Sequence, residues 1–271
     1  MKNEFKTGIF FTALGQYGSV IIQLGLNIVL SRLLTPKDFG VFAIIQVLVL
    51  FFRILAGQSI SPAIVQNKLL TNKDYGVIFN YSLIMGIVLA IFFGFFGNIL
   101  SKLFDNQIYV SLSWMMSFLI IADSVNCVPN GILAKEKRFK EVNLRFLFSL
   151  IAGAIVGITS AFLGAGVYAL IIFESIVTIS TLVLNLFLVK IEFTKSLDLQ
   201  PVKSIFFFVK HQTLFALIDY LYRNLDNLLI GIFLCATNLG NYSKGYQLTA
   251  FPISVLQSVI NPVIQPILSE H

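Results

Sequence analysis

Charged residues are scarce in this sequence: Asp, Glu, Lys and Arg make up 12% of its 271 residues, and the mean hydropathy is +0.86. A soluble domain of this size needs more polar surface than that composition supplies. Several stretches contain no charge at all, among them Thr7–Ser31, Gly76–Ser101 and Phe146–Phe173. Each is long enough to cross about 30 Å of hydrocarbon as a helix. The composition therefore excludes a water-soluble globular protein and predicts a polytopic membrane protein.

Cysteine and histidine are also rare, with two residues of each. Cys127 and Cys235 lie in apolar segments without a CxxC pair or a nearby histidine, so neither a disulfide framework nor a metal site is predicted. His211 stands alone at the start of an apolar segment. The HExxH, GxSxG and P-loop motifs are missing, as is GxGxxG in a suitable context. We therefore predict no catalytic residue, no metal and no cofactor.

The apolar segments predict an all-α fold, a polytopic membrane helix bundle without strands. Breakers such as proline, glycine and asparagine separate the segments. Eight helices are expected, at residues 8–33, 38–66, 75–103, 108–134, 143–163, 167–189, 206–234 and 239–268.

The turn residues between these segments carry local signals. Thr35 is a suitable cap for the second helix, Pro36 fits its first turn, and Asp38 suits the positive end of the helix dipole. Gly164–Gly166 predicts a tight turn. Pro62 predicts a kink in the second helix.

Lysine and arginine are distributed unevenly between the two sides of the predicted bundle. With a cytoplasmic N-terminus, 13 of the 19 basic residues fall on the cytoplasmic side and 4 on the outer side. The densest segment is KEKRFKEVNLR at 135–145, in which Arg145 counts as a cytoplasmic base. The bias predicts a cytoplasmic N-terminus, with anionic-lipid contact as an alternative role for that segment. Because the bases lie in loops between spans, no nucleic-acid partner is expected.

Residues 206–268 repeat residues 6–68 at an offset of 200, without a gap. Matched positions include Leu14 and Leu214, Asn27 and Asn227, Leu34 and Leu234, Gly40 and Gly240, and Pro62 and Pro262. Because the second copy begins six predicted helices after the first, both should cross the membrane in the same direction. The predicted symmetry axis then lies along the membrane normal, as in transporters built from two parallel halves.

This repeat divides the chain into three parts. Residues 1–190 form a first six-helix lobe, 191–205 a cytoplasmic linker, and 206–271 the first two helices of a second, pseudo-symmetric lobe. Complete symmetry would require four further helices. We therefore expect a chain that is truncated after the eighth helix.

Polar residues inside the predicted spans are the candidate functional groups, because buried charge must be paired or hydrated. In the seventh helix Gln212, Asp219, Arg223 and Asp226 share one face, and both acids are within reach of the arginine. One interpretation is an internal ion-pair cluster that fixes helix packing. The other is a polar stripe that faces a central water-filled cavity.

Two further helices contain related groups. On the first helix Gln16, Gln23 and Asn27 form a stripe, and the repeat places Gln23 opposite Arg223. Arg53 lies at the middle of the second helix as its only formal charge, which requires a cavity or a carboxylate partner. Asp123 is a plausible partner, and Glu174 is a third mid-span acid; for each acid a structural pair and a transport role remain open.

Several ordered segments resemble a known family. They include LSRLLTPKDFGVFA at 30–43, CVPNGILAKEKRFKEVNLRFL at 127–147 and LIDYLYRNLDNLLIGIFL at 217–234. Together they are similar to the polysaccharide-transport branch of the MATE/oligosaccharide flippase superfamily, which includes Wzx-like O-antigen flippases and teichuronic and colanic acid exporters.

The resemblance implies two six-helix lobes around a central cavity in the cytoplasmic (inner) membrane. It implies alternating-access transfer of undecaprenyl-pyrophosphate-linked oligosaccharide for O-antigen, capsule or exopolysaccharide. The implied partners are this lipid-linked oligosaccharide, membrane lipids, and glycan polymerase and chain-length regulator proteins.

Site roles follow from this resemblance and from the affinity of arginine for phosphate oxygens. The expected substrate-binding residues are Arg223, Arg53, Gln23, Asn27 and Asn227. The expected charge-pairing or ion-coupling residues are Asp219, Asp226, Asp123 and Glu174.

Three other interpretations stay open at this point. A cation-coupled drug antiporter of the same superfamily would favour acid-lined lobes, against which the arginines count. A membrane-bound glycan polymerase or ligase would need a large outer loop, whereas the predicted outer loops are short. The third is an inactive fragment of a disrupted flippase.

Overall fold

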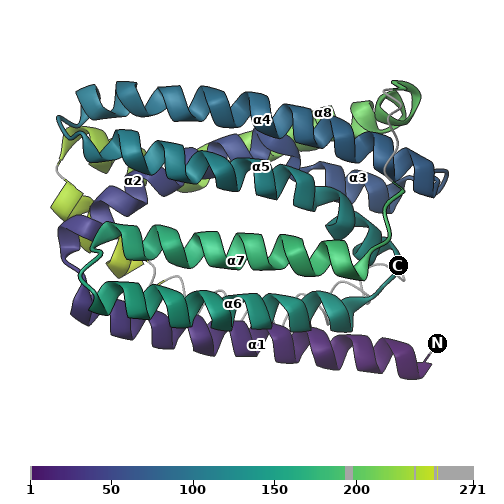
Figure 1. Cartoon of the computed structure of the whole chain (residues 1–271), viewed down its shortest axis with the longest axis horizontal. Coiled ribbons are helices and arrows are strands. Elements are labelled where there is room, and N and C mark those ends of the chain that lie inside the picture. The colour runs from purple at the N-terminus through teal and green to yellow at the C-terminus, as the bar shows by residue number, and fades with distance from the viewer. Residues whose placement is uncertain (1, 193–197, 235, 247–248, 250–271) are drawn as a thin grey trace.

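The computed structural model describes residues 2–192, 198–234, 236–246 and 249. These residues form long helices aligned along one common axis, with no strand among them (Figure 1), which confirms the predicted all-α helix bundle. The helices are α1 (Lys2–Leu33), α2 (Pro36–Arg53), α3 (Ile60–Gln66), α4 (Asn72–Leu103), α5 (Ile108–Lys135), α6 (Phe139–Phe162), α7 (Val167–Leu188) and α8 (Gln200–Phe233), with a π-helical turn η1 (Ile54–Gln58) between α2 and α3.

Five helices in the described part of the chain are long and apolar enough to cross a membrane. They are Pro36–Gln66, which includes η1 and α3, together with α4, α5, α6 and α7. The predicted helices at 8–33 and 206–234 form as α1 and α8 but are not among these five. Of the predicted helix at 239–268, residues 239–246 are helical and most of the remainder lies outside the described residues.

The helix starts follow from local capping, as Thr35 illustrates. The Thr35 backbone N–H donates to Asp38 Oδ2 at 2.9 Å, and the Asp38 N–H donates to Thr35 Oγ1 at 3.3 Å, which completes a capping box. Pro36 occupies the first turn, where its missing N–H costs no hydrogen bond. The predicted cap, proline and acidic residue of α2 are therefore confirmed.

The second span bends at a different residue from the predicted one. Gly57, inside η1, has φ +122°, a conformation that favours glycine, and the helix axis breaks there. Pro62 lies in the first turn of α3, where proline fits without breaking a helix. The kink was predicted from the proline, but the glycine produces it.

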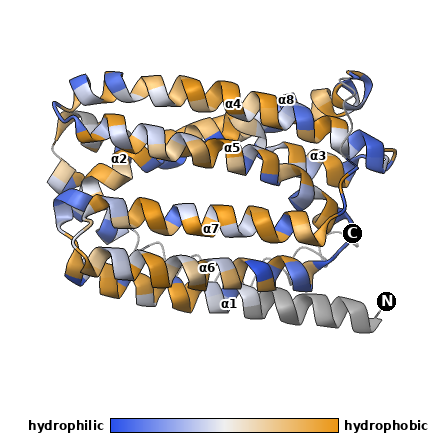
Figure 2. Ribbon diagram, viewed as in Figure 1, coloured by the Kyte–Doolittle hydropathy of each residue, from blue (hydrophilic) through white to orange (hydrophobic). Residues whose placement is uncertain are grey.

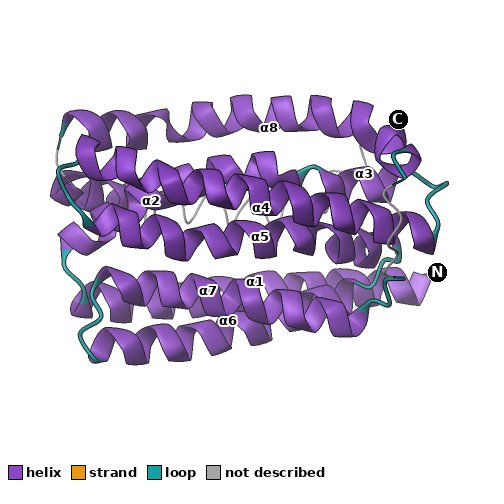
Figure 3. Ribbon diagram, turned by 45° about the horizontal axis from the view of Figure 1, so that its top comes forward, coloured by secondary structure: helices purple, strands orange, loops and turns teal. Residues whose placement is uncertain are grey.

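The helices form two groups. In Figures 1 and 3, α1, α6 and α7 lie together along one side, and α2 to α5 form the other side with α8 packed against α2, α3 and α4. Helix α7 joins the groups because it also packs on α5. Figure 2 shows hydrophobic residues along most of the helix length and hydrophilic ones gathered towards the ends. Large apolar side chains such as Phe92 and Phe95 are exposed on α4, as expected for contact with lipid.

The two copies of the repeat run in the same sense. Helix α1 leads from the end of the bundle that carries the N-terminus to the opposite end, and α8 crosses in the same direction (Figure 1). A Cβ atom added to Gly40 would lie 1.6 Å from the carbonyl oxygen of Ala236, and one added to Gly240 would lie 2.0 Å from the carbonyl oxygen of Pro36. Because Pro36 and Ala236 are themselves 200 residues apart, this contact is reciprocal, as twofold symmetry requires. The common direction and the reciprocal contact are what the predicted pseudo-twofold relation between the two copies requires.

Candidate functional site

A cluster of charges joins α2, α5 and α7 inside the first six helices. Arg53 Nε lies 2.6 Å from Asp123 Oδ2, and Arg53 Nη2 lies 3.5 Å from Glu174 Oε2. Gln46, two turns before Arg53 on the same face of α2, donates from Nε2 to Glu174 Oε1 at 2.6 Å. The structure thus pairs Arg53 with Asp123, the partner that the sequence analysis suggested, and it places Glu174, which was selected separately, beside them. It also adds Gln46, an uncharged amide that gave no signal in an apolar helix.

This Arg53 cluster contains two carboxylates and one guanidinium. All three side chains are mostly buried, with exposed fractions of 18% for Arg53, 28% for Asp123 and 18% for Glu174. With every group ionised, one negative charge has no counter-ion within the cluster. Burying such a charge is costly, so a proton or a cation would stabilise it.

A second polar group continues from Asp123 along α5. Asn185 of α7 donates from Nδ2 to Asn126 Oδ1 and, at 3.1 Å, to Asn130 Oδ1. Arg145 of α6 donates from Nη2 to the same Asn130 oxygen. The sequence analysis counted Arg145 as a cytoplasmic base, but its side chain points into the bundle and the residue is 7% exposed. The structure leaves open which side of the membrane this end of α6 faces, but it shows that Arg145 is packed inside the bundle and is not an exposed loop base.

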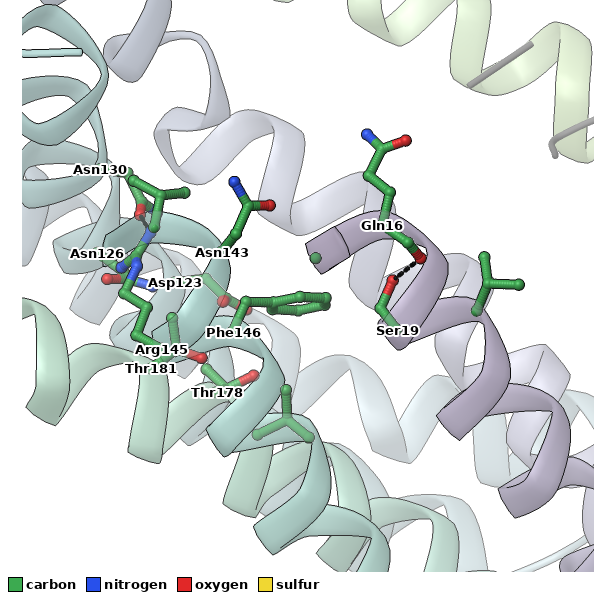
Figure 4. Close-up of a pocket in the computed structure, with 14 residues that line it drawn as sticks. Gln16, Ser19, Asp123, Asn126, Asn130, Asn143, Arg145, Phe146, Thr178 and Thr181 are labelled. Atoms are coloured by element: carbon green, nitrogen blue, oxygen red, sulfur yellow. Dashed lines mark hydrogen bonds between the residues drawn. The ribbon is translucent and has the colours of Figure 1, made fainter. Parts of the chain in front are cut away.

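A cavity of about 580 Å³ lies beside this second group, between α1, α5, α6 and α7 (Figure 4). In Figure 4, Arg145 and the asparagines lie on one side of it and Gln16 and Ser19 of α1 on the other. The Ser19 hydroxyl donates to the Gln16 carbonyl at 2.8 Å. The polar residues lining the cavity are Gln16, Ser19, Asp123, Asn126, Asn130, Asn143, Arg145, Thr178 and Thr181.

The charged face of α8 is separate from this interior. Arg223 Nε lies 2.9 Å from Asp219 Oδ2, and both side chains are exposed, at 69% and 44%. Asp226 instead accepts a hydrogen bond from the Tyr242 hydroxyl at 2.6 Å. Two acids were predicted to reach Arg223. The structure pairs Asp219 with it, whereas Asp226 bonds to Tyr242 in the helical segment that follows α8.

The polar stripe of α1 meets the second copy through Asn27. Its Oδ1 accepts a hydrogen bond from Lys244 Nζ at 2.7 Å, and the same nitrogen lies 3.9 Å from the centre of the Phe39 ring. Gln23 is exposed, and within the described part of the chain no hydrogen bond or ion pair joins it to Arg223. Asn227 is half-buried on α8 with its Oδ1 unpartnered.

The structure describes one of the two cysteines. Cys127 is half-buried on α5, and its Sγ donates to the Asp123 carbonyl oxygen at 3.2 Å. Cys235 lies outside the described residues.

Comparison with known proteins places these features in a family. The family described as polysaccharide biosynthesis protein matches residues 29–271. A membrane protein of unknown character from the cps region of Klebsiella pneumoniae is 25% identical, over 96% of this chain and 54% of its own length. The teichuronic acid biosynthesis protein TuaB of Bacillus subtilis is 20% identical, over 99% of this chain and 56% of its own length. The succinoglycan biosynthesis transport protein ExoT of Rhizobium meliloti is 24% identical, over 53% of this chain and 29% of its own length.

The chain thus spans about half the length of the first two relatives. No solved structure matches it. The five apolar helices and the membrane-protein relatives together identify a multi-pass membrane protein. Because the family match extends over most of the sequence, this chain belongs to the polysaccharide biosynthesis protein family.

Proposed function

We propose that this protein moves a lipid-linked oligosaccharide across the cytoplasmic membrane by alternating access, without enzymatic chemistry. The cargo class is an undecaprenyl-pyrophosphate-linked repeat unit of a surface or secreted polysaccharide. The names of two relatives, which refer to teichuronic acid and succinoglycan, support a role in polysaccharide export. In this proposal the described residues supply a first lobe and the start of a second, and the complete transporter has two lobes.

The observation that carries the proposal is a pair of arginines held by carboxylates, one buried inside the bundle and one exposed on α8. Arg53 is fixed between Asp123 and Glu174, and Arg223 is fixed at its Nε by Asp219. A pyrophosphate is a multiply charged anion with many acceptor oxygens, and a guanidinium in a poorly hydrated site is its natural partner. The exposed Arg223 side chain leaves its terminal donors available to a ligand, and amides such as Gln23 and Asn227 suit sugar hydroxyls.

The Arg53 cluster supplies a means of coupling. Because it holds one carboxylate more than it has guanidinium groups, uptake of one proton or monovalent cation would neutralise it. Neutralisation would weaken the attraction between α2 and its two acid-bearing neighbours, α5 and α7, and so bias the packing of the lobe. We therefore assign Asp123 and Glu174 to ion coupling and Arg223 to the cargo.

The proposed orientation follows the loops at one end of the bundle. The α3–α4, α5–α6 and α7–α8 connections lie at the same end as the N-terminus (Figure 1), and they carry most of the basic loop residues. Under the positive-inside rule this end faces the cytoplasm. Cargo would enter there and leave at the end that carries Thr35.

The test is transport by the full-length protein reconstituted in vesicles with a lipid-linked oligosaccharide in one leaflet. We expect Arg223→Ala to lower the transfer rate roughly tenfold or more and Arg223→Lys to retain part of it, since a point charge persists without the planar fork. Arg32→Ala, at the exposed end of α1, is the matched control. A normal rate for Arg223→Ala would refute the cargo role of this residue, and efflux of cationic drugs in place of glycolipid would favour the antiporter alternative.

A further inference from the structure

The cavity between α1, α5, α6 and α7 contains a buried cation that nothing in the transport proposal uses. We infer that this cavity is a binding site for a phosphate group, with Arg145 as its principal ligand. The site differs from the Arg223 face in its helices, its burial and its access. The inference rests on the packing of this lobe and holds whether or not Arg223 carries the cargo.

The state of the Arg145 guanidinium is the first argument. Its Nη2 donates to Asn130, but its Nε and Nη1 have no hydrogen-bond partner and almost no exposure to solvent. Within the described part of the chain no carboxylate lies within ion-pair distance of it. An unpaired buried charge is among the most costly groups in a membrane protein. The site is therefore complete only with an anion.

The neighbouring acid does not supply that anion. Asp123 lines the same cavity, but its Oδ2 lies 2.6 Å from Arg53 Nε, so its charge is already committed. Glu174 is held in turn by Arg53 and Gln46. Both buried acids are thus held by Arg53, with one negative charge left over in that cluster, and neither acid lies within ion-pair distance of Arg145. The Arg145 guanidinium therefore stays available for a ligand from outside the chain.

The lining of the cavity suits phosphate oxygens. Thr178 and Thr181 of α7 line the cavity and can supply hydroxyl donors, as can Ser19 of α1. Phosphate needs several donors of this kind around one guanidinium. The volume of about 580 Å³ lies within the range of ordinary ligand pockets and is sufficient for a phosphate or pyrophosphate.

The position of the cavity indicates how a phosphate would arrive. Arg145 is six residues from the start of α6, which is about 9 Å along the helix axis. Arg145 thus lies in the part of α6 next to the α5–α6 connection and not at the middle of the helix, so a phosphate from the lipid surface has a short path to it. Two nearby bases are already bound to protein groups: Lys135 donates to the Asn67 carbonyl and to Tyr75, and Arg138 pairs with Glu136 and Glu141. A phosphate-bearing lipid headgroup and a soluble phosphate would both find in Arg145 a buried cation without a counter-ion.

The experiment measures phosphate binding by the purified full-length protein in a detergent without phosphate. In one arm inorganic pyrophosphate is added and the thermal unfolding midpoint is recorded. In the other arm phosphatidylglycerol or undecaprenyl phosphate is added and the retained lipid is counted by native mass spectrometry. We expect wild type to bind in at least one arm, and the responding arm identifies whether the source is soluble or lipid.

Arg145→Met tests the role of the residue. We expect it to lower the affinity for phosphate by about tenfold or more in the responding arm and to unfold no earlier than wild type without phosphate, because it removes an unpaired buried charge. Arg145→Lys should retain part of the affinity. Arg138→Gln, on the same basic segment but paired with glutamates, should bind as wild type does.

Two results would overturn the inference. One is a wild-type protein that shows no phosphate-dependent change in either arm, which would mean that water alone completes the cavity. The other is an Arg145→Met protein that binds as well as wild type. A purely structural role for Arg145 would give a different pattern. Arg145→Met would unfold at a lower temperature than wild type, and added phosphate would not change the unfolding temperature of wild type.

Discussion

Three arginines in this bundle meet three different environments. Arg53 lies between two buried carboxylates, Arg223 pairs with one exposed carboxylate, and Arg145 is buried with one amide as its partner among the described residues. The cost of burying a guanidinium depends on its partners more than on its depth, because desolvation and pairing are of similar size. Each of the three arginines therefore has a distinct expected response to mutation.

The Arg53 cluster predicts an unequal response among its members. Replacing Arg53 by methionine leaves two buried carboxylates facing one another, which should destabilise the protein by about 3–5 kcal/mol. Asp123→Asn leaves Arg53 with Glu174 and brings the cluster to neutrality, so the loss should be much smaller. Thermal unfolding of the purified full-length protein would measure the order, with Arg32→Met, an exposed arginine, as the control. Equal losses for Arg53→Met and Asp123→Asn would show that charge balance does not govern this cluster.

At the residue scale, the sequence was sufficient to identify charged residues that lie alone among apolar neighbours. Arg53, Asp123 and Glu174 were recognisable because each is an isolated charge in a hydrophobic span. Asn185 was not, because an amide in an apolar helix is unremarkable until its neighbours are known. Arg145 was counted with the loop bases because it follows a run of them, and only the packing of α6 shows that its side chain is buried.

At the scale of the helix, the second span depends on one glycine. Gly57 adopts φ +122°, and a Cβ there would lie 2.6 Å from Ile60 Cδ1. Gly57→Ala should cost about 1–2 kcal/mol, because left-handed backbone is strained for other residues. Gly25→Ala on α1, where a Cβ meets nothing within 4 Å, should be neutral or slightly stabilising. The difference in stability between the two variants can be measured by thermal unfolding. An equal change in stability for both would mean that the bend does not depend on Gly57.

The existence and order of the helices followed from the sequence better than their breaks did. The capping box of Thr35 and Asp38 was recognisable because both partners lie within one turn. The break at Gly57 was not, because glycines are frequent in membrane helices and Pro62 is the stronger local signal. The backbone conformation of a glycine depends on how the surrounding helices pack, and the sequence does not show that packing. Here the packing partner of η1 is α5.

At the scale of the whole molecule, the repeat sets the relation between the two parts of the chain. The sequence indicated that residues 206–268 repeat residues 6–68 without a gap. It also indicated that the two copies cross the membrane in the same direction, because an even number of helices lies between them. The sequence did not reveal that the copies touch through the residues that match. Gly40 contacts Ala236, and Gly240 contacts Pro36, so the axis passes between the two glycines.

The reciprocal contact makes a final prediction, because two substitutions far apart in the sequence should act as one. A Cβ at Gly40 or at Gly240 would overlap a backbone carbonyl, at 1.6 and 2.0 Å, and neither backbone can yield without separating the two copies. Gly40→Ala and Gly240→Ala should therefore each destabilise the full-length protein by a similar amount, and the double variant should lose less than the sum, since the first substitution already opens the shared interface. Gly245→Ala, with nothing within 4 Å of its Cβ, is the control. Additive losses, or an effect from only one glycine, would mean that the two copies do not meet about a common axis.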